Sequence, residues 1–78
     1  MQNRNVYLIK DLAQLSGYSI YTLKYYSKLG LIKEVGRSFG TNFRYFDDTT
    51  IKSLKRIREL RHEAKSLKEI KQILTKEQ

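Results

Sequence analysis

The chain has no cysteine, no proline and only one histidine among its 78 residues. Without cysteine it can form neither a disulfide framework nor a thiolate metal site. The single histidine, His62, lies in a basic helical run with no nucleophile or set of metal ligands around it. We therefore expect a protein that is not an enzyme and that needs no cofactor.

Long apolar runs are also missing. No segment approaches the roughly 18–20 consecutive apolar residues that a membrane-spanning helix requires. The N-terminal segment Met-Gln-Asn-Arg-Asn contains no apolar core of a signal peptide. The sequence therefore predicts a cytoplasmic protein with no membrane partner.

Positive charge is what the chain has in excess, with 16 Lys and Arg against 8 Asp and Glu and a formal net charge of +8. These charges are spread over the whole chain and alternate with aromatic and aliphatic residues, which is typical of one folded domain over residues 1–78. The resulting field attracts polyanions, nucleic acid first among them. Charge alone does not distinguish DNA from an acidic protein or an anionic surface.

Two short helices are expected in the first third of the chain. Four apolar residues have the i, i+3, i+4 spacing of one helix face: Ile9, Leu12, Ala13 and Leu15. This spacing predicts a helix over about 9–15, which Gly17 ends in the left-handed conformation. Ser19 is a natural N-cap for a second helix over about 20–29. Together they predict a helix-turn-helix over about 9–29.

The second of these helices has a polar side rich in hydroxyl groups and amines. Its members are Tyr21, Thr22, Tyr25 and Lys28, with Lys24 and Tyr26 on the flanks. This composition is typical of a helix that enters the major groove of DNA, where donors meet phosphates and base edges. The rings of Tyr25 and Tyr26 could instead pack into a small core. Both roles are compatible, because tyrosine has an apolar body and a polar tip.

A hairpin wing is expected over about 31–46. Leu31-Ile32-Lys33 and Phe43-Arg44-Tyr45-Phe46 read as two short strands around a loop with two glycines. Alternation along the second strand places Arg44 opposite the face of Phe43 and Tyr45. Arg37 and Arg44 are then either DNA contacts or ordinary solvated charges.

A pair of helices is expected over about 48–74. Asp47 or Asp48 caps the first, which reaches about Ala64. Its buried stripe consists of Ile51, Leu54, Ile57, Leu60 and Ala64. Ser66-Leu67-Lys68-Glu69 is a capping box that opens the second, with Leu67, Ile70, Ile73 and Leu74 inward. The predicted fold is mainly α, with about four helices and a small two-stranded β wing.

Several segments in this order resemble the N-terminal DNA-binding domain of MerR-family transcription regulators. They are Ile9-Lys10-Asp11-Leu12-Ala13, Ser16-Gly17-Tyr18-Ser19, Thr22-Leu23-Lys24-Tyr25-Tyr26, Gly30-Leu31 and Phe43-Arg44-Tyr45-Phe46. The resemblance covers about residues 7–74. It implies a winged helix-turn-helix whose second helix enters the major groove while the wing contacts the flanking DNA backbone.

The resemblance also implies a set of DNA contacts. Tyr21, Thr22, Lys24 and Tyr26 would contact DNA from the recognition helix, and the helical wheel adds Tyr25. Arg37 and Arg44 would do so from the wing, together with Asn42 at a position that is usually glycine in the family. The third helix would contribute Arg61, with Arg58. Lys24 stands where the family usually has arginine, which replaces a bidentate fork by a point charge.

Family members typically continue into a long dimerisation helix and an effector domain, whereas this chain ends four residues after Leu74. We therefore expect either a domain of a longer regulator or a minimal relative, monomeric in isolation or assembling on DNA. The leading hypothesis is sequence-specific binding of double-stranded DNA by a transcription regulator associated with the nucleoid. An architectural DNA-binding protein, of the excisionase or terminase-small-subunit type, is the alternative. A third possibility is a module whose basic face docks an acidic protein partner.

Overall fold

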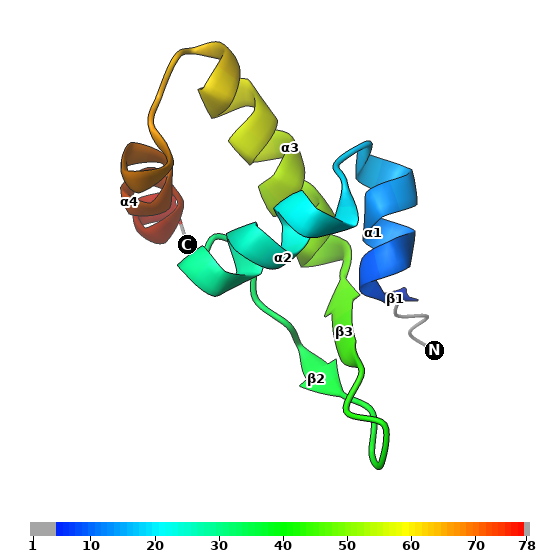
Figure 1. Cartoon of the computed structure of the whole chain (residues 1–78). Coiled ribbons are helices and arrows are strands. Elements are labelled where there is room, and N and C mark those ends of the chain that lie inside the picture. Colours follow the sequence, from blue (N-terminus) through cyan, green and yellow to red (C-terminus); the bar gives the residue numbers. More distant parts are fainter. Residues whose placement is uncertain (1–4, 78) are drawn as a thin grey trace.

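Four helices and a small sheet make up the computed structural model, which describes residues 5–77 (Figure 1). The elements are β1 (Val6–Tyr7), α1 (Ile9–Ser16), α2 (Ile20–Leu29), β2 (Gly36–Arg37), β3 (Arg44–Asp47), α3 (Asp48–His62) and α4 (Leu67–Glu77). The hairpin of β2 and β3 projects from the helical body, far from the turn between α3 and α4 (Figure 1). The predicted fold of four helices with a wing is confirmed. Residues 1–4, which belong to the segment where no signal-peptide core is expected, lie outside the described residues.

The helix-turn-helix has the predicted caps. Gly17 follows α1 with φ of 81°, in the left-handed region that glycine adopts most readily. Ser19 opens α2, where its Oγ accepts a hydrogen bond from the backbone N–H of Thr22 at 3.1 Å. Gly30 then ends α2 in the left-handed conformation. The bounds predicted for α2 agree with the structure, and α1 extends to Ser16.

The sheet has three antiparallel strands in the order β1-β3-β2, so the prediction of two strands was incomplete. The central strand, β3, pairs on one edge with β1 and on the other with β2. The strand predicted at 31–33 was wrong. Leu31 and Ile32 are both buried, and neighbouring side chains of a strand point to opposite faces. They enter the core from an irregular segment instead.

A single hydrophobic core joins the four helices to β3. Its ten buried residues are Leu12, Leu23, Tyr26, Leu31, Ile32, Phe46, Leu54, Ile57, Leu60 and Ile70. Burial of each large side chain stabilises the fold by about 1.5–3 kcal/mol. The stripe predicted on α3 is present except at its end, because α3 stops at His62 and Ala64 is exposed with φ of 63°. In the part of the chain described here, no helix is long and apolar enough to cross a membrane.

The capping box at the start of α4 is confirmed. The backbone N–H of Ser66 donates to Glu69 Oε1 at 2.9 Å, and the N–H of Glu69 donates to Ser66 Oγ at 3.2 Å. The hydrogen bond from the Ser66 N–H to the carboxylate is the first cause that lowers the pKa of Glu69. At its other end α4 is joined to α3 by Arg56, whose Nη2 donates to Glu77 Oε2 at 2.7 Å.

Candidate nucleic-acid interface

The outer face of α2 presents tyrosine and lysine side chains to solvent. Tyr21 is 82% exposed and Tyr25 is 47% exposed, and Lys24 lies exposed between them. Thr22 is half-buried, and its hydroxyl accepts a hydrogen bond from Ser19 Oγ at 3.0 Å. This face therefore offers several hydrogen-bond donors on one rigid element.

Tyr26, by contrast, belongs to the core. Only 5% of its surface is exposed, and its ring meets that of Tyr18 edge to face with centroids 5.4 Å apart. Burial is the first cause that raises the pKa of Tyr18. The two rings fix α2 against the turn that precedes it. That Tyr26 also reaches DNA stays a prediction.

A basic groove of about 940 Å³ lies between α2, the start of α1 and the wing. Five cationic side chains line it: Lys10, Lys24, Lys28, Arg37 and Arg44. Asn42 also lines it, and Glu34 is the one carboxylate among the described lining residues. The groove thus brings Lys24, the one predicted contact of the recognition helix that lines it, together with the predicted wing contacts Arg37, Asn42 and Arg44.

Two of these cations were missing from the predicted contacts. Lys28 was placed on the polar side of the helix but was not counted as a contact, although it follows Lys24 by one helical turn and i, i+4 neighbours share a helix face. Lys10 enters the groove only because α1 packs against α2, and that packing is not a local property of the sequence.

The wing holds two arginines directly across from each other, since Arg37 pairs with Arg44 in the register of β2 and β3. Like charges at such positions destabilise a sheet. Glu34 offsets this repulsion, because its Oε1 lies 3.0 Å from Arg37 Nη2 and 3.4 Å from Arg44 Nε. Its Oε2 also contacts Arg37 Nε. The hydrogen bond to Arg37 lowers the pKa of Glu34.

Arg58 and Arg61 lie on α3, and Arg58 has a partner within the protein. Its Nη2 donates to the backbone oxygen of Ser16 at 2.6 Å, and its guanidinium carbon lies 4.6 Å from the centroid of the Tyr18 ring. Arg58 therefore ties α3 to the end of α1. Arg61 is exposed, and its positive charge interacts electrostatically with the hydroxyl group of Tyr18.

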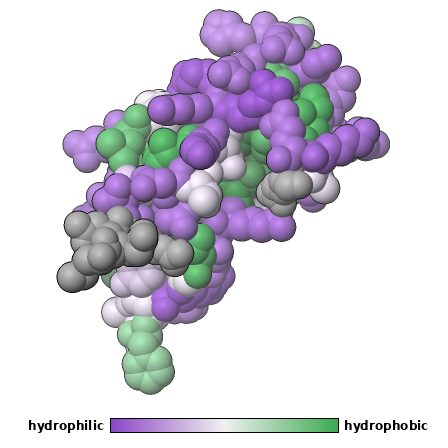
Figure 2. Space-filling model, turned by 180° about the vertical axis from the view of Figure 1, so that it is seen from behind, coloured by the Kyte–Doolittle hydropathy of each residue, from purple (hydrophilic) through white to green (hydrophobic). Residues whose placement is uncertain are grey.

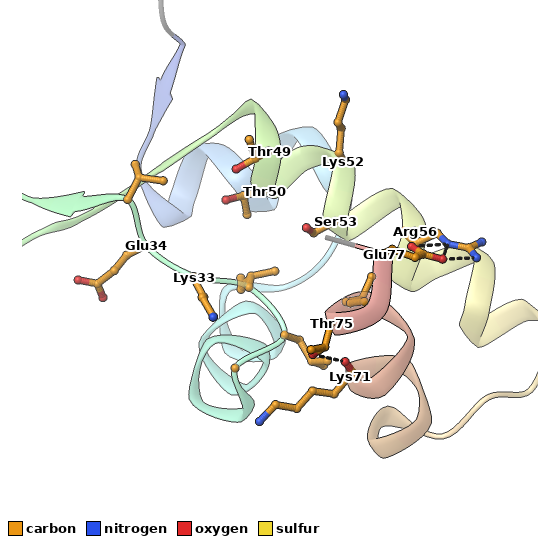
Figure 3. Close-up of a pocket in the computed structure, with 15 residues that line it drawn as sticks. Lys33, Glu34, Thr49, Thr50, Lys52, Ser53, Arg56, Lys71, Thr75 and Glu77 are labelled. Atoms are coloured by element: carbon orange, nitrogen blue, oxygen red, sulfur yellow. Dashed lines mark hydrogen bonds and ion pairs between the residues drawn. The ribbon is translucent and has the colours of Figure 1, made fainter.

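A second hollow, of about 690 Å³, lies between the end of α2, α3 and α4 (Figure 3). Arg56 and Glu77 face each other at its edge, whereas the amino group of Lys52 points away from it (Figure 3). Its charges are mixed, so it is less suited to a polyanion than the basic groove. Residues 5–77 contain no cluster of three side chains that could hold a metal ion.

Comparisons with known proteins agree with the fold. The model of a family described as MerR HTH family regulatory protein matches residues 7–77. A transcriptional regulator of the MerR family from Bacillus cereus is 27% identical, with a TM-score of 0.84, over 91% of this chain and 52% of its own. HiNmlR, a MerR family regulator that lacks the sensor domain and was crystallised bound to promoter DNA, is 35% identical. Its TM-score is 0.76, over 88% of this chain and 52% of its own. The chain thus spans about half the length of these structures, and no curated protein sequence matches it significantly.

Proposed function

The chain belongs to the MerR family of helix-turn-helix regulatory proteins, and from this we propose that it binds double-stranded DNA and regulates transcription. The observation that carries the proposal is the basic groove between α2 and the wing. A similar regulator was crystallised on promoter DNA, which supports duplex DNA as the ligand. The family and fold are those of regulators, and we propose no enzymatic activity.

In the proposed complex, α2 enters the major groove, which is about 12 Å wide and admits a helix. Tyr21, Lys24 and Tyr25 are exposed on α2 and would reach base edges or phosphates. Because lysine is a point charge without a planar fork, Lys24 would serve chiefly as a phosphate contact. Sequence readout would then depend on the tyrosine hydroxyls.

One strand of the DNA backbone would lie in the basic groove. Lys24 and Lys28 would contact it from α2, and Arg37 and Arg44 from the wing. Contacts to phosphates position a protein without reading sequence. This arrangement would hold α2 at a defined depth and register in the major groove.

The salt dependence of binding tests this proposal. Each phosphate contact adds about −0.9 to the slope of log affinity against log salt, so about four to seven contacts predict a slope near −4 to −6. Lys24→Ala should weaken binding of a fluorescent duplex and reduce the magnitude of the slope by about 0.9. Lys55→Ala removes the same charge from an exposed position of α3 that lines neither hollow, and it should have a smaller effect.

Other outcomes would assign other functions. Binding that does not respond to salt would contradict the proposal. DNA bending with side-by-side assembly and no effect on a promoter would indicate an architectural role. An acidic protein that binds while no duplex does, even at low salt, would make the basic groove a protein-docking surface. Sedimentation with and without duplex tests our further expectation of a monomer that assembles on DNA.

A further inference from the structure

The end of the wing carries a large apolar side chain in full contact with solvent. Phe39 is 104% exposed, more than any other large apolar residue described. Figure 2 shows the apolar tip of the projecting hairpin, set apart from the rest of the surface. A phenylalanine in such a position contributes nothing to the core. A binding partner that buries it would gain free energy from the apolar area removed from water.

The loop around Phe39 is held in a defined shape. Ser38 donates its backbone N–H to the oxygen of Phe43 at 2.8 Å, and its Oγ accepts from the N–H of Phe43 at 2.9 Å. The oxygen of Ser38 also accepts from the N–H of Asn42 at 3.0 Å, and its hydroxyl contacts that of Thr41. Phe39 therefore follows a residue whose backbone and side chain are both hydrogen-bonded. Less conformational entropy is then lost when the end of the hairpin binds a partner.

The arginines of the wing fix where this tip would lie on a duplex. Arg37 and Arg44 pair across the strands and line the basic groove, whereas Phe39 lies two residues beyond Arg37 toward the end of the hairpin. A phosphate backbone separates the major groove from the minor groove. With α2 on the major-groove side and the arginines at the backbone, as in the proposed complex, the tip would lie over the minor groove.

We propose that Phe39 enters the minor groove of the bound duplex and wedges its ring between neighbouring base pairs. This inference rests on the proposed function and adds a residue and a mode of contact to it. Apolar side chains that enter the minor groove commonly unstack a base step and bend the duplex. Insertion would therefore favour DNA whose base steps open easily at the position that the wing reaches.

A second copy of the chain is a weaker candidate for the partner of Phe39. The formal charge of +8 makes two copies repel each other. Arg37 is the charged residue nearest to Phe39 in the sequence, and the groove that it lines carries five cations against one carboxylate, Glu34, so it attracts a polyanion. The charges around the tip therefore favour DNA.

The test compares Phe39→Ala with Phe39→Leu on short duplexes enriched from a random-sequence pool by the unaltered protein. An adenine analogue whose fluorescence rises when it is unstacked, placed at successive positions of the duplex, shows where a base step opens. Phe39→Ala should bind roughly tenfold more weakly and lose the rise in fluorescence. The salt slope should not change, because no charge is removed. Phe39→Leu should retain most of both signals, since leucine also acts as a wedge.

Leu15→Ala provides the matched control, because Leu15 is 62% exposed and does not line the basic groove. It should bind as the unaltered protein does. The melting temperature of Phe39→Ala should also be unchanged. If Phe39→Ala binds the enriched duplex normally with the same fluorescence rise, the wedge is wrong and the proposed function stands. If Phe39→Ala lost self-association but kept DNA binding, the partner of Phe39 would be a second copy of the chain. If the unaltered protein enriches no duplex, both proposals fail.

Discussion

Glu34 holds Arg37 through both oxygens of its carboxylate, with Oε1 3.0 Å from Arg37 Nη2 and Oε2 against Nε. The same Oε1 lies 3.4 Å from Arg44. The two wing arginines are thus partly neutralised in the free protein by an acid of the same hairpin. A DNA phosphate that binds either arginine must compete with this carboxylate.

Glu34→Gln should bind DNA several-fold more tightly at low salt and with a steeper salt slope. The substitution removes a negative charge from the basic groove and frees the guanidinium groups of Arg37 and Arg44 to bind phosphates. Fluorescence anisotropy against a duplex measures both effects. Glu77→Gln is the control, because Glu77 also pairs with an arginine, Arg56, but outside the groove. Equal affinities of Glu34→Gln and the unaltered protein would show that Glu34 does not compete with DNA.

Arg58 is expected to act on stability more than on DNA affinity. Arg58→Ala removes the hydrogen bond to Ser16 and the stacking on Tyr18, which should lower the free energy of unfolding by about 1–2 kcal/mol. Arg58→Lys should restore little of it, because lysine lacks the planar group. Urea denaturation measures the loss. Normal stability with a salt slope reduced by about 0.9 would instead make Arg58 a phosphate contact.

The elements that could be predicted from the sequence are those with local causes. Ser19 and Gly30 bound α2 through caps that involve only neighbouring residues, and Ser66 with Glu69 does the same for α4. Such signals need no knowledge of the rest of the fold. The corresponding predictions were therefore accurate to within a few residues.

The features that were missed depend on contacts between distant segments. The strand β1 has only two residues, and it exists because Tyr7 pairs with Phe46 of β3. The bridge of Glu34 to two arginines requires the register that sets Arg37 against Arg44. Leu31 begins an apolar run that fits a strand and a buried loop equally well, and periodicity cannot decide between them for short runs.

The stability of the fold should fall in acid, partly through the capping box of α4. Glu69 has a pKa below its ordinary value of 4.5, because the N–H of Ser66 binds the charged carboxylate. Its contribution is therefore fully present above that value and is lost as the pH falls through the lowered pKa. Glu69→Gln keeps the shape of the box without the charge. The difference in urea midpoint between the two proteins should be constant near neutral pH and shrink below about pH 4.5. A difference that does not change with pH would show that Glu69 does not contribute to the loss of stability in acid.

Tyr25 and Tyr26 are neighbours on α2 that should separate DNA binding from folding. Tyr25 is 47% exposed on the proposed DNA face, whereas Tyr26 is 5% exposed and packs against Tyr18. Tyr25→Ala should weaken DNA binding and leave the melting temperature nearly unchanged. Tyr26→Ala should cost about 3–5 kcal/mol of stability, because it leaves a cavity in the core.

Tyr26→Phe shows whether Tyr26 has a second role. It keeps the ring in the core and removes only the hydroxyl, so a purely structural Tyr26 predicts unchanged DNA affinity in an anisotropy titration. A loss of affinity with normal stability would mean that the hydroxyl reaches the duplex from the edge of the core, as the resemblance to the family implies. The same titration with Tyr25→Phe compares the hydroxyl on the exposed side. If neither hydroxyl matters, sequence readout by α2 must rest on other side chains, and Tyr21 becomes the next position to change.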